Sequence, residues 1–194
     1  MEITSAQLKE LRDLTGISVM QCKKALEEAG GDMDKAKIIL QKKGGEMAHK
    51  KSDRELGAGA IGSYVHATHE VAALVKLSCE TDFVSKNQEF VTLARDIAMH
   101  VAAQNPPYIS REEVDEEALQ KAKEVFAEEV KDKPADMQEK ILNGKLDAYF
   151  KDRILLEQPF IKDPEKTIGT LISNAIQKFG ENIVISTISR ISVK

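Results

Sequence analysis

Residues 61–84 read IGSYVHATHEVAALVKLSCETDFV, and this stretch decides the fold. A polar turn at residues 67–70 separates two runs with strand character, of which the second spans residues 71–79. Two such runs joined by a short polar turn predict an antiparallel β-hairpin. The first run alternates between two sets of residues, as a strand does: Ile61, Ser63 and Val65 against Gly62, Tyr64 and His66.

The segments that follow this hairpin are mostly helical. Residues 111–153 are highly charged, with sparse apolar positions on either side of Pro134, and they predict a helical hairpin that projects from the body. Before it lies the strongest amphipathic pattern in the chain, at steps of three and four residues. Its apolar residues precede Asn105-Pro106-Pro107, which end the helix: Phe90, Leu93, Ala94, Ile97, Ala98 and Val101.

The C-terminal part completes an α+β region. Residues 155–161 are expected to form a loop around Pro159, and an amphipathic helix then runs from Ile168 to a stop at Gly180. Residues 183–193 are rich in Ile, Ser, Thr and Val, which is typical of a strand. The prediction is a small antiparallel sheet of about three strands packed with helices. So small a sheet has edges to protect, and pairing with a second subunit would cover them.

Three short helices precede the sheet. Three helices in about 45 residues form a small module that is marginal on hydrophobic burial alone. Residues 46–55 are polar and lack an apolar stripe, which fits a linker or a solvated helix. We therefore expect a three-helix module at 1–45, a linker at 46–59 and a core at 60–194, with its helical hairpin at about 111–153. Caps and glycines are expected to bound the helices: Thr4, Ser18 and Asp32 at their starts, and Gly16, Gly30-Gly31 and Gly44-Gly45 at their ends.

Composition narrows the class of protein. Hydrophobic residues make up 42% of the 194 positions, enough for a packed core. The 28 basic and 32 acidic residues give a net charge of −4, which argues against nucleic acid as the main partner. The N-terminus lacks the apolar centre of a signal peptide, and no apolar run approaches the roughly 20 residues that a membrane helix needs. We expect a cytoplasmic protein in which Cys22 and Cys79 are buried, reduced thiols.

Motifs for covalent chemistry are absent from the sequence. It contains neither a G-x-x-x-x-G-K-[ST] phosphate loop nor a G-x-G-x-x-G after a strand, so we expect no cofactor. His66 and His69 have a metal-like spacing but flank the predicted turn without further ligands, so we expect no metal site. Cys79 and His100 could form a thiol and its base, but a small buried hydrophobe and a helix-surface imidazole are favoured. The sequence therefore predicts no catalytic residue.

The segment Glu80-Thr81-Asp82-Phe83-Val84 allows two interpretations. In the first, Asp82 or Ser85 caps the following helix while the two apolar residues enter the core, and composition alone favours this. In the second, an exposed aromatic side chain beside a carboxylate stands on an anchored loop and inserts into a pocket of a partner.

Five blocks of the chain, in order, resemble the elongation factor Ts family. The resemblance covers nearly the whole sequence, and the length fits the short form of the family, which has one core subdomain. The blocks are the opening motif within residues 11–26, residues 79–84 (Cys-Glu-Thr-Asp-Phe-Val), residues 97–102 with Pro106, residues 157–160 and residues 180–183.

The resemblance implies a guanine-nucleotide exchange factor for elongation factor Tu. It implies that the N-terminal module, of the ubiquitin-associated (UBA) type, docks on the nucleotide domain of the GTPase, and that short members form homodimers in a Tu2Ts2 assembly. Val19 stands where the family usually has Met and presents less apolar area. The implied contacts are Arg12, Val19, Met20 and Lys23 in the module, and Thr81, Asp82, Phe83 and Val84 in the loop that displaces the Mg²⁺ of the GTPase, with Phe83 inserted between helices of the partner.

Two other functions fit parts of the sequence. A UBA-type adapter would bind another protein through its N-terminal module, and residues 81–84 would be dispensable. An enzyme that used Cys79 with a histidine would lose activity in Cys79→Ser and keep it in Phe83→Ala. An exchange factor requires only a state of the GTPase that it binds better than the GDP-bound state.

Overall fold

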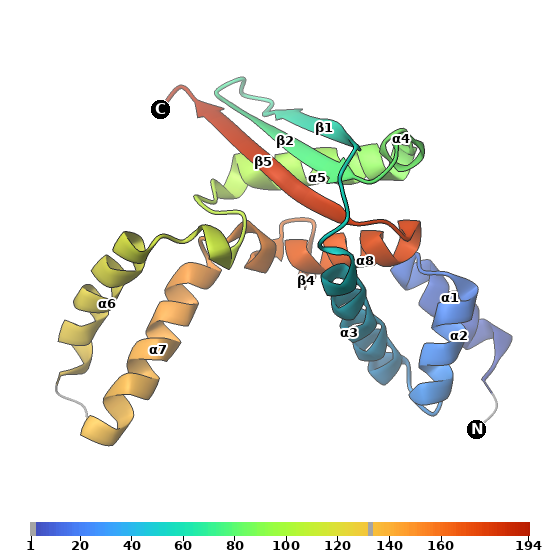
Figure 1. Ribbon diagram of the computed structural model, residues 1–194, viewed down its shortest axis with the longest axis horizontal. Helices are drawn as coiled ribbons and strands as arrows, with labels where there is room; N and C mark the ends of the chain where they lie inside the picture. The colour runs from blue at the N-terminus through green and yellow to red at the C-terminus, as the bar shows by residue number, and fades with distance from the viewer. Residues whose placement is uncertain (1–2, 132–133) are drawn as a thin grey trace.

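The protein is a three-stranded antiparallel sheet from which two helical parts extend, as a computed structural model of residues 3–131 and 134–194 shows (Figure 1). The side chains of residues 135 and 136 are not described, and residues 1, 2, 132 and 133 of the predicted module and hairpin lie outside the described residues. The strand order is β1-β2-β5. The predicted α+β class is confirmed. The strands are β1 (Ala58–Val65), β2 (Val71–Cys79) and β5 (Ile183–Ser192).

The main core lies between this sheet and two helices, α5 (Gln88–Gln104) and α8 (Ile168–Phe179). The predicted antiparallel β1–β2 hairpin is confirmed, and its register places Gly62 opposite Val75. Gly62 faces α5 so closely that a Cβ there would lie 2.6 Å from the backbone nitrogen of Arg95 and closer still to the Ala94 carbonyl group. Glycine at this position therefore lets the strand backbone contact the helix backbone.

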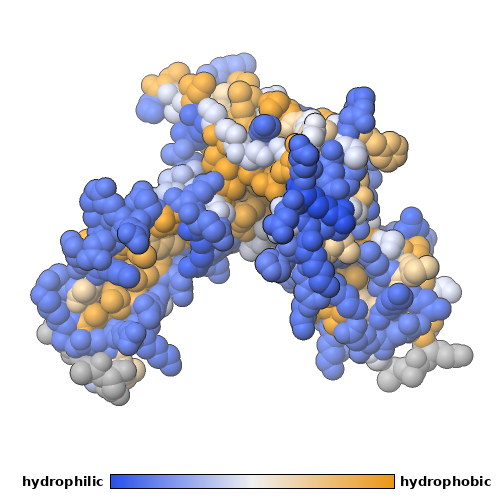
Figure 2. All heavy atoms as spheres, in the orientation of Figure 1, coloured by the Kyte–Doolittle hydropathy of each residue, from blue (hydrophilic) through white to orange (hydrophobic). Residues whose placement is uncertain are grey.

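The other face of the sheet is open. We call it the outer sheet face; its exposed apolar residues are Ile61, Val65, Leu74, Val184, Ile191 and Val193. Residues 61 and 65 pair with residues 76 and 72 of β2, which pair in turn with residues 187 and 191 of β5, so these residues share one side of the sheet. Figure 2 shows hydrophobic residues gathered over the strands. No described helix covers this face.

The N-terminal module consists of α1 (Ser5–Thr15), α2 (Val19–Glu28) and α3 (Met33–Lys51). The predicted capping box at Thr4 and the N-cap at Asp32 are confirmed, and Gly16 ends α1 in the left-handed conformation. The three helices enclose a core of their own, separate from that under the sheet. Its buried residues are Leu11, Ile17, Cys22, Ala25, Leu26, Ala36 and Leu40.

The prediction that Gly44-Gly45 ends the third helix is wrong, because α3 continues to Lys51. Gly44 is buried where α3 crosses α8, and a Cβ there would lie 3.1 Å from Cδ of Gln177 and closer still to its amide nitrogen. The glycine thus serves close packing of two helices, and this tertiary contact outweighs its low helix propensity. Only residues 52–57 of the predicted linker are irregular.

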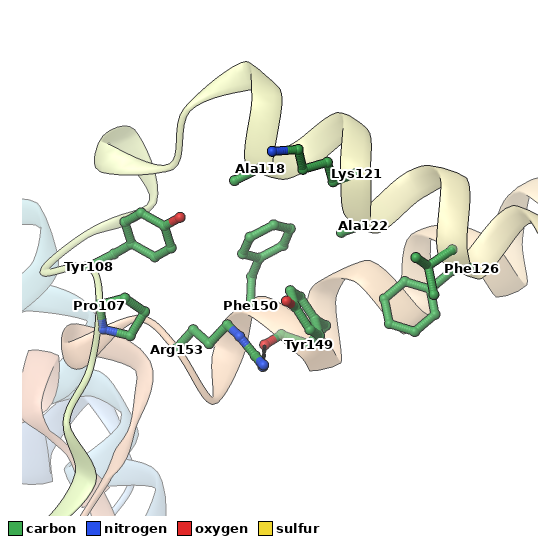
Figure 3. Close-up of a pocket in the computed structure, with 10 residues that line it drawn as sticks. Pro107, Tyr108, Ala118, Lys121, Ala122, Phe126, Tyr149, Phe150 and Arg153 are labelled. Atoms are coloured by element: carbon green, nitrogen blue, oxygen red, sulfur yellow. Dashed lines mark hydrogen bonds between the residues drawn. The ribbon is translucent and has the colours of Figure 1, made fainter. Parts of the chain in front are cut away.

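The helical hairpin is formed by α6 (Glu116–Val130) and α7 (Ala135–Lys151), as predicted. A third small core joins them to residues 108 and 154 at their base. Beside it lies a cavity of about 330 Å³ with largely aromatic walls, shown in Figure 3. In its wall, the Arg153 guanidinium lies 3.6 Å from the centre of the Tyr149 ring and stacks on it.

The connection from the hairpin to α8 differs from the predicted loop. It contains a 3₁₀ turn, η2 (Leu155–Glu157), and a short strand, β3 (Pro159–Phe160), which pairs with β4 (Asp163–Thr167). A two-residue strand that begins with proline is too short to show an alternating pattern, so the sequence did not reveal it. A second 3₁₀ turn, η1 (Arg111–Glu113), precedes α6.

Candidate partner-binding site

The aromatic loop, residues 80–84, follows the end of β2 and includes the first three residues of a single helical turn, α4 (Asp82–Ser85). Phe83 is 83% exposed, more than any other large hydrophobic residue that the structure describes, whereas Val84 is 3% exposed and packs in the main core. Adjacent residues of a helical turn point in directions about 100° apart, so burial of Val84 directs Phe83 outward. The geometry is an exposed ring on an anchored turn.

This arrangement contradicts part of the first interpretation of the loop and agrees with the exposed aromatic side chain of the second. The prediction that Phe83 enters the core is wrong, whereas the prediction that Val84 enters the core is confirmed. Neither Asp82 nor Ser85 caps α5; the cap is Asn87, whose Oδ1 accepts from the Glu89 backbone nitrogen at 2.9 Å. The Asp82 carboxylate stays at the surface, 2.6 Å from the Lys86 ammonium, which lowers its pKa.

Two carboxylates hold the loop against the start of β5. Glu181 accepts hydrogen bonds from the backbone nitrogens of Glu80 and Thr81, at 3.1 and 3.0 Å, and from the Thr81 hydroxyl at 2.5 Å. In the opposite direction, Glu80 accepts from the Asn182 backbone nitrogen at 2.6 Å. Charge-assisted bonds to backbone donors are the stronger kind, so this crossed pair restrains the loop backbone next to Phe83.

The same junction reaches the segment between α3 and β1. Arg54 donates to both carboxylate oxygens of Glu80, at 3.2 and 3.3 Å, and the Asn182 side-chain amide donates to the Ser52 carbonyl oxygen at 3.4 Å. Glu181 and Arg54 are not among the residues predicted for this site. Residues 180–183 were recognised as a block, but no local pattern indicates a partner about a hundred positions earlier.

The Glu80 carboxyl provides a pH test of this junction. Its pKa lies below the ordinary 4.5, first because of the Asn182 N–H and then because of Arg54. A carboxyl group whose pKa is lower in the folded state than in the unfolded state stabilises the fold at pH values above its unfolded-state pKa. This stabilisation is lost as the pH falls through the folded-state pKa. We therefore expect Glu80→Gln to lower the Tm at about pH 7 and to have little effect at about pH 3. Thermal unfolding followed by circular dichroism measures both; an equal loss at the two pH values would contradict an ionic role.

The four predicted residues of the module lie on its surface. Met20 is 69% and Val19 is 44% exposed in the first turn of α2, and Arg12 on α1 is exposed as well. Lys23 follows one turn later and pairs loosely with Glu27 at 3.9 Å. The structure thus presents two exposed apolar side chains flanked by two cations on α1 and α2.

A steric contact connects this module to α8. Gly16 lies against Lys178 of α8, so that a Cβ on the glycine would be 3.5 Å from Nζ. Lys178 is also ion-paired with Glu89, in the first turn of α5. In Figure 1, α1, α2 and α4 lie on the same side of the molecule. The two groups of predicted residues therefore stand on separate elements, and α8 contacts both the module, at Gly16, and α5, which follows the aromatic loop.

His100 and Cys79, considered above as a possible base and thiol, are both buried. His100 is fully buried, so the prediction of a helix-surface imidazole is wrong: Nε2 lies 2.9 Å from the Gln158 Oε1, and burial lowers the pKa of the ring. Cys79 is also buried, as predicted; its thiol donates to the Thr81 carbonyl oxygen, and burial raises its pKa. A raised thiol pKa disfavours the nucleophilic thiolate.

The connection between β1 and β2 contains His66 and His69, and the His66 Nδ1 lies 3.0 Å from the Thr68 hydroxyl. Among the described residues, no three His, Cys, Asp or Glu side chains are grouped as a metal site would require. Within residues 3–131 and 134–194, every helix is too short or too polar to cross a bilayer.

Comparison with known proteins identifies related sequences along the whole chain. The family model described as Elongation factor TS matches residues 19–193. Elongation factor Ts of Thermodesulfovibrio yellowstonii is 48% identical over 194 residues, which cover 100% of this chain and 97% of that protein. The protein of the same name from Thermosipho melanesiensis is 48% identical over 98% of both chains. That of Fervidobacterium nodosum is 47% identical over 100% of this chain and 99% of its own length.

Proposed function

The chain belongs to the elongation factor Ts family, and we propose that it is a guanine-nucleotide exchange factor for elongation factor Tu in the cytoplasm. One observation supports this most strongly: Phe83 stands out from a turn that Val84 and Glu181 hold in place. A rigidly supported aromatic side chain loses little conformational entropy on insertion into a partner. Exchange of this kind needs no nucleophile, acid or base of its own.

The mechanism follows from the role of Mg²⁺ in GTPases. The ion bridges the nucleotide phosphates and the protein and neutralises phosphate charge, so displacement of its ligands weakens nucleotide binding. We propose that Arg12, Val19, Met20 and Lys23 dock on the nucleotide domain. Phe83 then inserts between helices of the GTPase, and Thr81 and Asp82 complete the contact that displaces the ion. Val84, which is buried in the main core, contributes by anchoring the turn.

Thermodynamic linkage makes the process reversible. If the factor weakens GDP binding by some ratio, GDP weakens binding of the factor by the same ratio. GTP that enters the opened site therefore expels the factor.

The direct test is release of a fluorescent GDP analogue from elongation factor Tu in a stopped-flow instrument. Addition of the chain with excess unlabelled nucleotide should accelerate release in proportion to its concentration until the complex saturates. Unchanged release would refute the proposal. The adapter alternative predicts binding without acceleration, and the Cys79 alternative predicts sensitivity to Cys79→Ser, which an exchange factor should tolerate.

We also propose the domain division predicted from the sequence, with a module at 1–45 and a core at 60–194. The connection at 46–59 includes the end of α3 and the start of β1, and only residues 52–57 of it are irregular. The separate hydrophobic cores of the module and of the sheet region support this division. The polar junction around Arg54 would then set the position of the aromatic loop relative to the module.

A homodimer is proposed as the working form, giving a Tu2Ts2 assembly, and its contact is the outer sheet face. Ile61 is 62% and Ile191 is 68% exposed there, on the two edge strands. Between them the face carries mostly small side chains and one cation, Lys76, which forms no ion pair with any described residue. Two such faces can stack as the layers of a β-sandwich do.

Introducing a charge on this face should separate the subunits. Ile191→Asp, opposite Ala72, would bury an unpaired carboxylate in each half of the contact, at a cost of several kcal/mol per ion. We expect sedimentation equilibrium to change from the dimer mass to the monomer mass. The control is Val125→Asp, on the exposed side of α6, which should sediment as the parent does. An unaltered dimer in Ile191→Asp would place the contact elsewhere.

A further inference from the structure

The N-terminal module meets the main core where α3 packs on α8 (Figure 1). The α3 helix belongs to both cores, since Leu40 is buried in the module and Met47 packs against the main core. Between the two helices, Gln177 of α8 is 5% exposed, and its Nε2 donates to the Leu40 carbonyl oxygen at 2.5 Å. We call this hydrogen bond the Gln177 bridge.

Gly44 gives Gln177 access to that carbonyl group. In an α-helix the carbonyl group of residue 40 points toward residue 44. A Cβ on Gly44 would lie 3.1 Å from Cδ of Gln177, and closer still to its amide nitrogen, and 3.3 Å from Cβ of Ser173. A larger residue at position 44 would therefore displace the amide from Leu40.

The Gln177 bridge leaves a polar atom unsatisfied. Oε1 of Gln177 is buried and accepts no hydrogen bond from the residues that the structure describes. A buried acceptor without a donor costs at least as much free energy as one hydrogen bond between neutral groups contributes. We therefore expect methionine, which has a similar length and no amide to satisfy, to pack here at least as stably.

The bridge adds direction to the contact between the two helices. A hydrogen bond depends on the angle at which donor and acceptor meet, whereas burial of apolar surface does not. Other polar links between α3 and α8 lie at the surface, such as that from Gln41 to the Thr170 hydroxyl at 3.3 Å. A single polar residue in a helix contact can fix the register of the helices at a cost in stability.

We propose that Gln177 is a positioning residue that fixes the register of α3 on α8, and with it the placement of the module relative to the aromatic loop. Four residues after Gln177, Glu181 accepts the hydrogen bonds that hold the loop next to Phe83. One short segment therefore contacts both parts. The proposal deepens the proposed function and rests on it in one respect: exchange requires the module and Phe83 to contact one GTPase at the same time.

A distance between the module and the core tests this register without any GTPase. Nitroxide labels at Lys35→Cys in α3 and Ala103→Cys in α5 occupy exposed positions. The native thiols, Cys22 and Cys79, are buried and should stay unlabelled. In double electron–electron resonance, Gln177→Met should widen the distance distribution about twofold, or shift it by about 1.5 Å for a slip of one residue, with an unchanged or higher Tm. An unchanged distribution would overturn the proposal.

Gly44→Ala and Gly45→Ala provide a matched pair for the same measurement. Both substitutions add helix propensity to α3, but a Cβ on Gly45 would meet no atom within 4 Å. We expect Gly44→Ala to widen the distribution as Gln177→Met does, because it displaces the same amide. Gly45→Ala should leave the distribution as in the parent. Equal effects of the two alanines would contradict the role of the bridge.

The consequence for exchange is measured separately, by stopped-flow release of the fluorescent GDP analogue. Gln177→Met should raise the concentration of the factor that gives half-maximal acceleration by about threefold or more, because two binding surfaces that are held together loosely bind one partner less tightly. The control is Gln120→Met, at an exposed position of α6, which should behave as the parent does.

The two measurements separate the possible failures. If the parent chain does not accelerate GDP release, the proposed function is refuted, and the distances still decide whether Gln177 sets the register. If Gln177→Met widens the distribution but leaves the half-maximal concentration unchanged, placement of the module has no part in exchange and the positioning role is overturned.

Discussion

Phe83→Ala is expected to abolish most of the acceleration of GDP release while leaving the fold unchanged. Truncation of an aromatic side chain at the centre of a contact costs about 2 kcal/mol or more, which corresponds to about thirtyfold in a rate or binding constant. The ring is 83% exposed in the free chain, so its removal should change the free energy of unfolding by less than about 0.5 kcal/mol. We therefore expect Phe83→Ala to lose exchange activity without losing stability.

Stopped-flow release of a fluorescent GDP analogue measures the acceleration of GDP release, and urea unfolding measures the free energy of unfolding. Val125→Ala is the matched control, because it also truncates an exposed apolar side chain but lies on α6, away from the aromatic loop. It should accelerate GDP release as the parent does. Full activity of Phe83→Ala would show that the ring takes no part, and the proposed insertion would fail.

Local patterns predicted the elements that make up the fold. Alternation and a short polar turn were enough for the β1–β2 hairpin, and the steps of three and four residues were enough for α5. Capping chemistry placed the starts of α1 and α3, because a side chain that accepts from a backbone nitrogen three residues later acts within one turn. These features depend only on neighbours in sequence.

Features that depend on distant residues could not be predicted in this way. In the sequence Gly44 is typical of a helix end, but in the structure it packs against α8. His100 is likewise typical of a surface histidine in the sequence, but in the structure it is buried beside Gln158. The bonds from Glu181 to the aromatic loop cross a hundred positions of sequence. In each case a tertiary contact decides the outcome, and a single sequence carries no local signal for it.

The aromatic loop shows why composition alone misjudged one of two neighbouring residues. Phenylalanine is usually buried, so both Phe83 and Val84 were expected in the core on that basis. A single helical turn at the end of a strand cannot direct two adjacent side chains to the same side. Since the smaller residue fills the core position, the larger one is left in solvent. The proposed insertion into a partner would bury this exposed ring.

Gly62→Ala is expected to destabilise the core severely. The added Cβ would lie 2.6 Å from the backbone nitrogen of Arg95 and closer still to the Ala94 carbonyl group, and backbone atoms cannot rotate away as a side chain can. Strand β1 and helix α5 must therefore separate, at a cost of about 3 kcal/mol or more, which is a large fraction of a stability of about 5–15 kcal/mol. For a chain of this size we expect the Tm to fall by about 10 °C.

The same substitution at Gly144 should have the opposite effect. Gly144 lies inside α7, and a Cβ there would meet no atom within 4 Å, so alanine adds helix propensity without a clash. We expect a gain of up to about 1 kcal/mol. Differential scanning calorimetry of the two variants compares one chemical change in two environments. If Gly62→Ala melts at the temperature of the parent, the strand does not approach the helix as closely as described. The aromatic loop, which joins the end of this hairpin to α5, would then be less rigidly placed than the proposed exchange mechanism requires.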